Sequence, residues 1–180
     1  MTEIETLFNG RYLRLCRRGQ WEFVERTNPG GAVVIIALTQ EGRLLFVEQF
    51  RAAINLRSIE LPAGLIGDEH GNQHENALAA AQRELLEETG YRADRIEYLM
   101  HGPSSSGMST EMITFVRAHD LTRVHAGGGD TTEQITVHEI AFENVRNWLN
   151  NKQRQGYSLD PKLYAGLYFL EHGGVEHLLP

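Results

Sequence analysis

Residues 75–91, ENALAAAQRELLEETGY, carry the strongest structural signal in this chain. At about 100° per residue, the stretch predicts an amphipathic helix in which Glu84 and Glu88 fall within about 40° of each other, as i,i+4 neighbours do. Glu87 falls about 60° to the other side of Glu84 in the same projection. Gly90 stands where a left-handed C-cap ends a helix. Beside the acidic patch runs a predicted apolar stripe: Leu78, Ala81 and Leu85.

Two interpretations of the acidic patch stay open on the helix alone. Carboxylates this close repel one another, and a divalent cation such as Mg²⁺ or Mn²⁺, which prefers oxygen ligands, would remove the repulsion. An ordinary solvated helix face would also be rich in glutamate, and Arg83 and Glu87 form the i,i+4 ion pair typical of such a face. The surrounding sequence has to decide between them.

Composition indicates one globular domain preceded by a small N-terminal extension. A length of 180 residues fits one domain with a real core. The net charge of -7 argues against nucleic-acid binding through a basic patch. No apolar run reaches the roughly 18 residues of a membrane span, and MTEIETLFNG lacks the apolar core of a signal peptide. The single Cys16 excludes an internal disulfide and is predicted to be a small buried residue. We therefore expect a cytoplasmic protein.

The rest of the chain reads as strands with few helices, which predicts a mixed α/β sandwich. A composition break at NPGG places a boundary near residue 28. Residues 32–38, AVVIIAL, form a continuous apolar run typical of a strand buried on both faces. The other expected elements are a hairpin over 11–26 turning at Gly19, extended segments over 44–50, 58–62, 96–100, 111–117 and 135–141, and helices over 142–150 and 161–171.

The spacing from Glu75 to Tyr91 resembles the Nudix box, G-x5-E-x7-R-E-U-x-E-E-x-G-U, in which U is a bulky apolar residue. Every fixed position from Glu75 onward matches. The upstream glycine departs from the pattern, because ten residues rather than five separate Gly64 of LPAGLIG from Glu75. The difference indicates a five-residue insertion within GDEHGNQH, in a loop of a kind that tolerates changes of length.

Further landmarks resemble the ADP-ribose pyrophosphatase branch of the Nudix hydrolases: WEFVER, VEQFR, ELPAGLI, SSSGMSTE and AGGGDTTEQI. The resemblance implies an α/β/α sandwich with a mixed central sheet over residues 29–180, preceded by a small β domain over residues 1–28. It also implies a homodimer in which the N-terminal parts are exchanged. The implied activity is Mg²⁺-dependent (or Mn²⁺-dependent) hydrolysis of a nucleoside diphosphate sugar to a nucleoside monophosphate and a sugar phosphate.

The same resemblance assigns the metal site. Glu84 and Glu88 match direct metal ligands, and the Ala63 carbonyl matches a backbone ligand. Glu87 matches the carboxylate that holds water or a second ion, while Glu75 and Arg83 match structural residues that orient the others. Glu133, in the loop before the strand at 135–141, matches a metal ligand or the base that activates water. Glu111, at the end of SSSGMSTE, is a second candidate for that base.

The substrate residues are implied in the same way. Trp21 matches an aromatic that stacks on the nucleobase, with a core or interface tryptophan as the alternative, and Glu22 beside it could accept from a base edge. Arg51 matches a phosphate-binding arginine, for which the guanidinium fork is suited. Arg26 is a further phosphate candidate, and Lys162 occupies a position near the distal part of the substrate.

Three alternatives remain at this point. The fold could act on another diphosphate, such as GDP-mannose, UDP-glucose, NADH or a dinucleoside polyphosphate, and the AGGG segment keeps GDP-mannose in play. The chain could be a ligand sensor without activity, although the complete box and the lack of a basic DNA-binding segment argue against that. An isomerase on this fold would need a catalytic cysteine, and Cys16 is poorly placed in the N-terminal hairpin.

Overall fold

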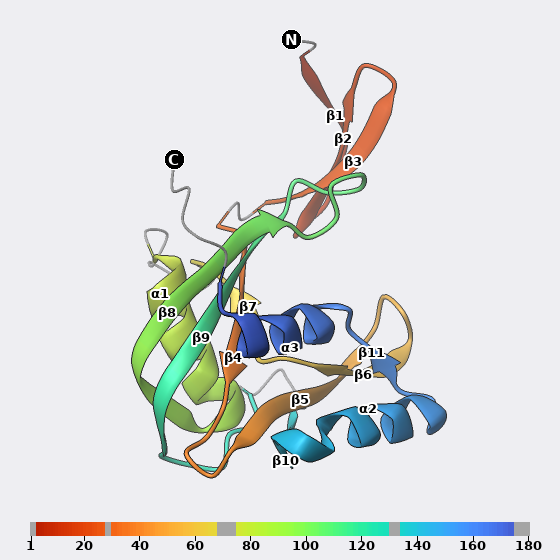
Figure 1. Cartoon of the computed structure of the whole chain (residues 1–180). Helices are drawn as coiled ribbons and strands as arrows, with labels where there is room; N and C mark the ends of the chain where they lie inside the picture. The colour runs from red at the N-terminus through yellow and green to blue at the C-terminus, as the bar shows by residue number, and fades with distance from the viewer. Residues whose placement is uncertain (1–2, 28–29, 68–74, 130–133, 175–180) are drawn as a thin grey trace.

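An antiparallel three-stranded sheet forms the N-terminal part of the protein and stands away from the rest (Figure 1). The computed structural model describes residues 3–27, 30–67, 75–129 and 134–174. The predicted hairpin is confirmed as β2 (Leu13–Arg18) and β3 (Trp21–Arg26), and Gly19 takes a φ of 63° in the turn. A further strand, β1 (Ile4–Asn9), pairs with β2 and was not predicted. The Val24 N–H donates to the Met108 carbonyl (2.8 Å), which attaches this sheet to the body.

Two four-stranded mixed sheets form the body of the protein. The first has the order β7-β4-β9-β8 and includes β4 (Ala32–Ala37), β7 (Ala63–Leu65), β8 (Tyr91–Pro103) and β9 (Met112–Arg123). The second has the order β10-β5-β6-β11 and includes β5 (Arg43–Arg51), β6 (Leu56–Glu60), β10 (Thr136–Ala141) and β11 (Ser158–Leu159). Strands β4 and β9 run parallel, as do β6 and β11, and the other pairs are antiparallel.

Helices cover both faces of β4. The strand is buried from its second residue, Val33, to its end, as the apolar run predicted. Val33 and Ile35 pack in one core cluster with α1 (Ala77–Glu84). Val34 and Ile36 pack in the other with α2 (Val145–Arg154) and α3 (Lys162–His172); a 3₁₀ turn over Phe142–Asn144 precedes α2. The predicted α/β/α sandwich is confirmed (Figure 1). No helix in the described ranges is both long and apolar enough to cross a membrane.

The helix of the quoted stretch differs from its prediction in two details. It ends as an α-helix at Glu84 and continues as one π-helical turn over Leu85–Thr89, after which Gly90 takes the predicted left-handed conformation (φ 75°). The predicted apolar stripe is wrong at Leu78, which is 41% exposed. Ala80 is buried in its place beside Ala81 and Leu85, because the small alanine side chains let the helix pack closely on the sheet.

A buried carboxylate joins β5 to the neighbouring elements of the second sheet. Glu48 accepts from Arg57 Nε (2.6 Å), His138 Nε2 (3.0 Å) and Lys152 Nζ (2.9 Å). Burial alone raises the pKa of the Glu48 carboxyl, but the hydrogen bonds from Lys152, His138 and Arg57 outweigh burial and hold its pKa to about 2. The ionised carboxylate therefore ties β6, β10 and α2 to β5.

We predict that Glu48→Gln lowers the free energy of unfolding by about 2–3 kcal/mol at pH 7, since a pKa depressed by about 2.5 units corresponds to stabilisation of that order. A depressed carboxyl pKa stabilises the fold above its unfolded value and loses that effect as the pH falls from about 4.5 to about 2. The gap between wild type and variant should roughly halve by pH 3. Urea unfolding at both pH values measures it, and a gap that is constant with pH would contradict the role given to ionised Glu48.

Candidate active site

Arg83 holds three glutamates together at the start of the acidic patch. Its Nε and Nη2 donate to Glu75 (both 3.1 Å), and its Nη1 donates to Glu84 (2.8 Å) and Glu87 (3.2 Å). A further bond from Nη2 reaches the Leu65 carbonyl (3.0 Å) on β7. Hydrogen bonding to Glu75 is the main reason that the pKa of Arg83 is raised, and the same contact lowers the pKa of Glu75. The orienting role predicted for Arg83 is therefore consistent with its contacts.

The two predicted metal ligands face β7 from the helix. The Glu88 carboxylate is 2% exposed and accepts from the Ala63 N–H (3.0 Å). The Glu84 carboxyl lies so close to Gly64 that a Cβ on Gly64 would stand 1.8 Å from Glu84 Cδ. Gly64 therefore leaves the space that the Glu84 carboxylate occupies. Two carboxylates and the Ala63 carbonyl are oxygen donors, so this set fits the preference of a small divalent cation.

Within the part of the chain that the structure describes, no group of three or more His, Cys, Asp or Glu side chains is arranged to hold a metal ion. The set consists of the pair Glu84 and Glu88 with the backbone of Ala63, and Arg83 contacts both Glu84 and Glu87 beside it. Glu133, predicted as a further ligand or as the base, lies outside the described residues. Its role stays a prediction.

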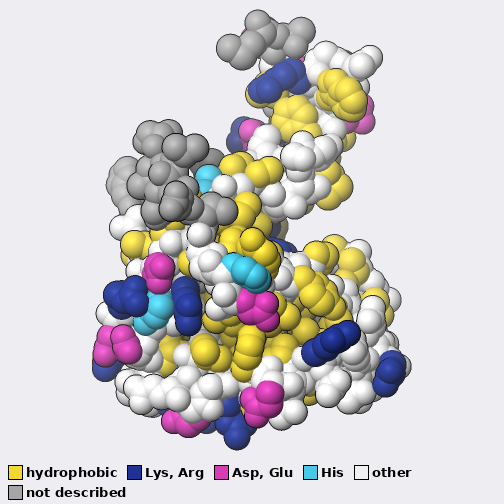
Figure 2. Space-filling model, in the orientation of Figure 1, with side chains coloured by type: hydrophobic (Ala, Val, Ile, Leu, Met, Phe, Trp, Pro, Cys, Tyr) yellow, Lys and Arg dark blue, Asp and Glu magenta, His cyan; other side chains and the backbone are white. Residues whose placement is uncertain are grey.

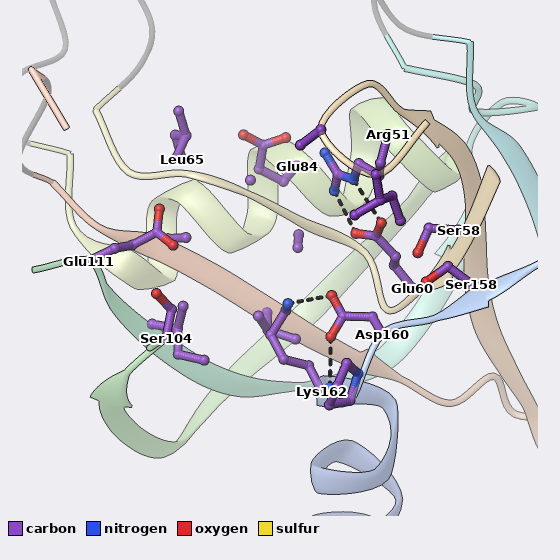
Figure 3. A pocket seen from close by; sticks show the side chains of 18 of the residues that line it. Arg51, Ser58, Glu60, Leu65, Glu84, Ser104, Glu111, Ser158, Asp160 and Lys162 are labelled. Atoms are coloured by element: carbon purple, nitrogen blue, oxygen red, sulfur yellow. Dashed lines mark hydrogen bonds and ion pairs between the residues drawn. The ribbon is translucent and has the colours of Figure 1, made fainter. Parts of the chain in front are cut away.

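A pocket of about 640 Å³ opens beside these residues (Figure 3). Ala63, Gly64 and Glu84 form one wall. Around the same space stand three cations, each paired with a carboxylate that also lines the pocket: Arg26 with Glu111, Arg51 with Glu60, and Lys162 with Asp160. Arg51 makes two bonds to Glu60, from Nε (2.7 Å) and Nη2 (2.5 Å). The pocket thus combines donors for phosphate oxygens with acceptors for hydroxyl groups.

The structure brings together most of the predicted substrate residues but not all of them. Arg26, Arg51, Glu111 and Lys162 line the pocket. Trp21 and Glu22 do not; they lie in β3 on the N-terminal sheet, where Trp21 is 70% exposed. Within a single chain, Trp21 therefore stands apart from the predicted phosphate-binding residues.

Sequence reasoning missed the acidic and hydroxyl side of the pocket: Ser58, Glu60, Ser158 and Asp160. Asp160 had a signal, since an aspartate before Pro161 is typical of a helix start, and its Oδ1 accepts from the Lys162 N–H (2.8 Å). Ser58 and Ser158 meet only because β6 and β11 pair in parallel, and a two-residue strand such as β11 gives no recognisable pattern.

Comparisons with known proteins agree on one family. A family model described as "NUDIX domain" matches residues 28–162. The chain is 31% identical over 156 residues to the methanol dehydrogenase activator of Bacillus methanolicus, covering 83% of this chain and 82% of that protein. It is 31% identical over 124 residues to the ADP-ribose pyrophosphatase of Bacillus subtilis (strain 168), covering 68% and 64%. It is 30% identical over 166 residues to the GDP-mannose pyrophosphatase of Cronobacter sakazakii (strain ATCC BAA-894), covering 88% and 81%.

A solved structure of an ADP compounds hydrolase has the same fold. It aligns with a TM-score of 0.70 at 19% identity, covering 94% of this chain and 90% of that one. The two molecules therefore share the same overall fold.

We predict that Arg83→Lys weakens binding of Mg²⁺ or Mn²⁺ by about 10–100-fold, the usual effect of losing a residue that orients metal ligands. Lysine keeps the charge, but it cannot donate in a fork to Glu75 and Glu84 together. Calorimetric titration with Mn²⁺ measures the affinity. Arg95→Lys is the matched control, because exposed Arg95 donates to half-exposed Glu97 (3.4 Å) on the same strand, β8. Equal affinities for both variants would contradict the role of Arg83.

Proposed function

Because the chain belongs to the Nudix family, we propose that it hydrolyses the pyrophosphate bond of a nucleoside diphosphate sugar, of the ADP-ribose or GDP-mannose type. The products are a nucleoside monophosphate and a sugar phosphate. The chain is a Nudix pyrophosphatase, and the relatives named for ADP-ribose and GDP-mannose support the substrate class. The observation that carries the proposal is Glu84 at the wall of a pocket lined by three cations, with buried Glu88 accepting from the N–H of Ala63, which lines the same wall.

We propose Mg²⁺, with Mn²⁺ as the alternative, as the ion that Glu84, Glu88 and the Ala63 carbonyl hold, with Glu87 and Glu133 as further acidic groups. A divalent ion held there would offset negative charge and lower the pKa of a water molecule, so that hydroxide would be available to attack phosphorus. The positions of buried Glu88 and of Glu84 beside Gly64 support this choice of ligands, because the fold holds both carboxylates in place before any ion binds.

The chain's own residues supply binding and proton transfer. Arg26, Arg51 and Lys162 line the pocket and would donate to the diphosphate. To do so, each cation would divide its N–H groups between the phosphate and the carboxylate that it contacts now. Glu111, which lines the pocket, is one candidate for the proton acceptor, and Glu133 is the other. Glu60, Asp160, Ser58 and Ser158 would accept from or donate to sugar hydroxyls.

The N-terminal sheet (residues 1–28) is proposed as a dimerisation element that exchanges between two copies. Large apolar side chains on it are exposed: Phe8, Tyr12, Leu13 and Trp21. Figure 2 shows hydrophobic side chains on the visible face of the projecting N-terminal part. A monomer rarely leaves so many on a small projecting sheet. Exchange would also explain why Trp21 lies outside its own chain's pocket, since it would then stack on a base in the partner's pocket.

We predict that one or a few nucleoside diphosphate sugars dominate turnover in a panel that contains ADP-ribose, GDP-mannose, UDP-glucose, NADH and a dinucleoside polyphosphate. Phosphate release after coupling to a phosphatase measures it in the presence of Mg²⁺. Glu88→Gln should abolish turnover, because the amide cannot supply a negatively charged metal ligand. Glu97→Gln, an exposed change on β8, is the control that should keep full activity.

If the wild type binds these ligands but hydrolyses none of them, and Glu88→Gln binds them equally well, the hydrolase proposal is wrong and the protein is a ligand sensor. If only NADH or a dinucleoside polyphosphate is hydrolysed, the pyrophosphatase activity stands but the proposed substrate class, a nucleoside diphosphate sugar, is wrong.

We predict that Trp21→Ala raises KM through loss of stacking worth about 1–3 kcal/mol and leaves kcat nearly unchanged. If the sheets exchange, co-expression of Trp21→Ala with Glu88→Gln should restore low-KM activity in the mixed dimer. One pocket then contains intact Glu88 from one chain and Trp21 from the other. Purification by two different tags isolates the mixed species, and light scattering gives its mass. A mixed dimer with no low-KM activity would rule out exchange.

A further inference from the structure

A glycine segment packs backbone to backbone on the end of the box helix. Four N–H groups of residues 124–129 donate to box carbonyls: Val124 and His125 to Gly90 (2.8 and 3.2 Å), Gly128 to Glu88 (2.8 Å) and Gly129 to Glu87 (3.1 Å). The last carbonyls of a helix have no partner within it, and they carry partial negative charge. These N–H groups satisfy them next to side chains that are themselves acidic.

Only glycine allows this approach. Gly127 has a φ of 74°, and a Cβ there would stand 2.4 Å from the Thr89 carbonyl carbon and 2.6 Å from the Glu88 carbonyl oxygen. Across the contact, a Cβ on Gly90 would stand 2.2 Å from the His125 carbonyl oxygen. Because the obstructing atoms are backbone, a side chain at either position must push the two segments apart.

We propose that Gly127–Gly129 is a positioning element for the acidic residues of the active site, an inference that rests on the proposed function. Glu88 is fixed at its side chain by the Ala63 N–H and at its backbone by the Gly128 N–H. The Gly128 carbonyl in turn accepts from the Ile135 N–H (3.2 Å), just before β10. The Gly128 peptide therefore joins the π-turn that carries Glu87 and Glu88 to the start of β10.

This contact indicates a second structural role for Gly90 of the Nudix box. Its left-handed conformation ends the helix, and its missing side chain admits residues 125–127 against the turn. Substitution at Gly127 should therefore move the backbone of Glu88, although Gly127 does not line the pocket.

The test compares Gly127→Ala with Gly42→Ala. Gly42 has nearly the same φ, 71°, but a Cβ there meets no atom within 4 Å. Both variants carry the same left-handed strain, and Gly127→Ala adds the backbone clash, so Gly127→Ala should lose more thermal stability than Gly42→Ala and kcat is compared at a temperature at which both are folded. Only Gly127→Ala should lose kcat, by about 100-fold for a displacement of about 1 Å, with KM little changed. Equal kcat in the two variants would overturn the proposal.

A measurement on the metal-free wild type keeps the proposal testable if Gly127→Ala does not fold or no substrate is found. Amide hydrogen exchange should show the Gly128 and Gly129 N–H groups protected in wild type and in Gly42→Ala. Folded Gly127→Ala should lose that protection. Rapid exchange of both amides in wild type would overturn the proposal independently of any activity.

Discussion

The site depends on keeping like charges together, and Arg83 makes that possible. Glu84 and Glu87 on the helix and Glu75 just before it would repel one another, yet all three accept from one guanidinium. The same group reaches the Leu65 carbonyl, so it also fixes the distance between the helix and β7. Glu75 extends the network, because its carboxylate accepts from the Gly67 N–H (2.9 Å). Without this cation, folding would have to bring the carboxylates together against their repulsion.

The sheets serve this arrangement by supplying a rigid support on which the helix lies. β4 is buried on both faces, and its register with β7 places Ala63 and Gly64 opposite Val34 and Val33. Ala80 and Ala81 pack the helix closely on the same sheet. Glu84 and Glu88 then meet β7 without a side chain between them. Close packing of small residues therefore contributes as much to the geometry of the site as the acidic residues do.

Sequence periodicity predicted the elements that depend on local pattern and missed those that depend on pairing. The box helix, the buried strand β4 and the left-handed Gly90 follow from spacing and glycine chemistry. β7 and β11 have three and two residues, too few for a period to show, and they form because a partner strand is present. Leu78 was misplaced because the face that packs on the sheet carries the small Ala80 and Ala81 with Leu85, and Leu78 lies outside it.

The charged residues predicted to bind substrate show that sequence also predicts the type of a residue better than its partner. A basic residue at a motif position predicts an anion partner, but it does not say which anion. In the structure, Arg26, Arg51 and Lys162 hold Glu111, Glu60 and Asp160. Glu111 comes from a segment distant in sequence from Arg26, so no spacing could reveal that pair, whereas Glu60 lies on the strand after Arg51 and Asp160 lies two residues before Lys162. Because each pair is nearly neutral, a diphosphate entering this pocket meets donors that are already oriented but not free. The acidic partners should therefore favour ligands that bring hydroxyl groups along with phosphate, since only these give the carboxylates something to accept in exchange.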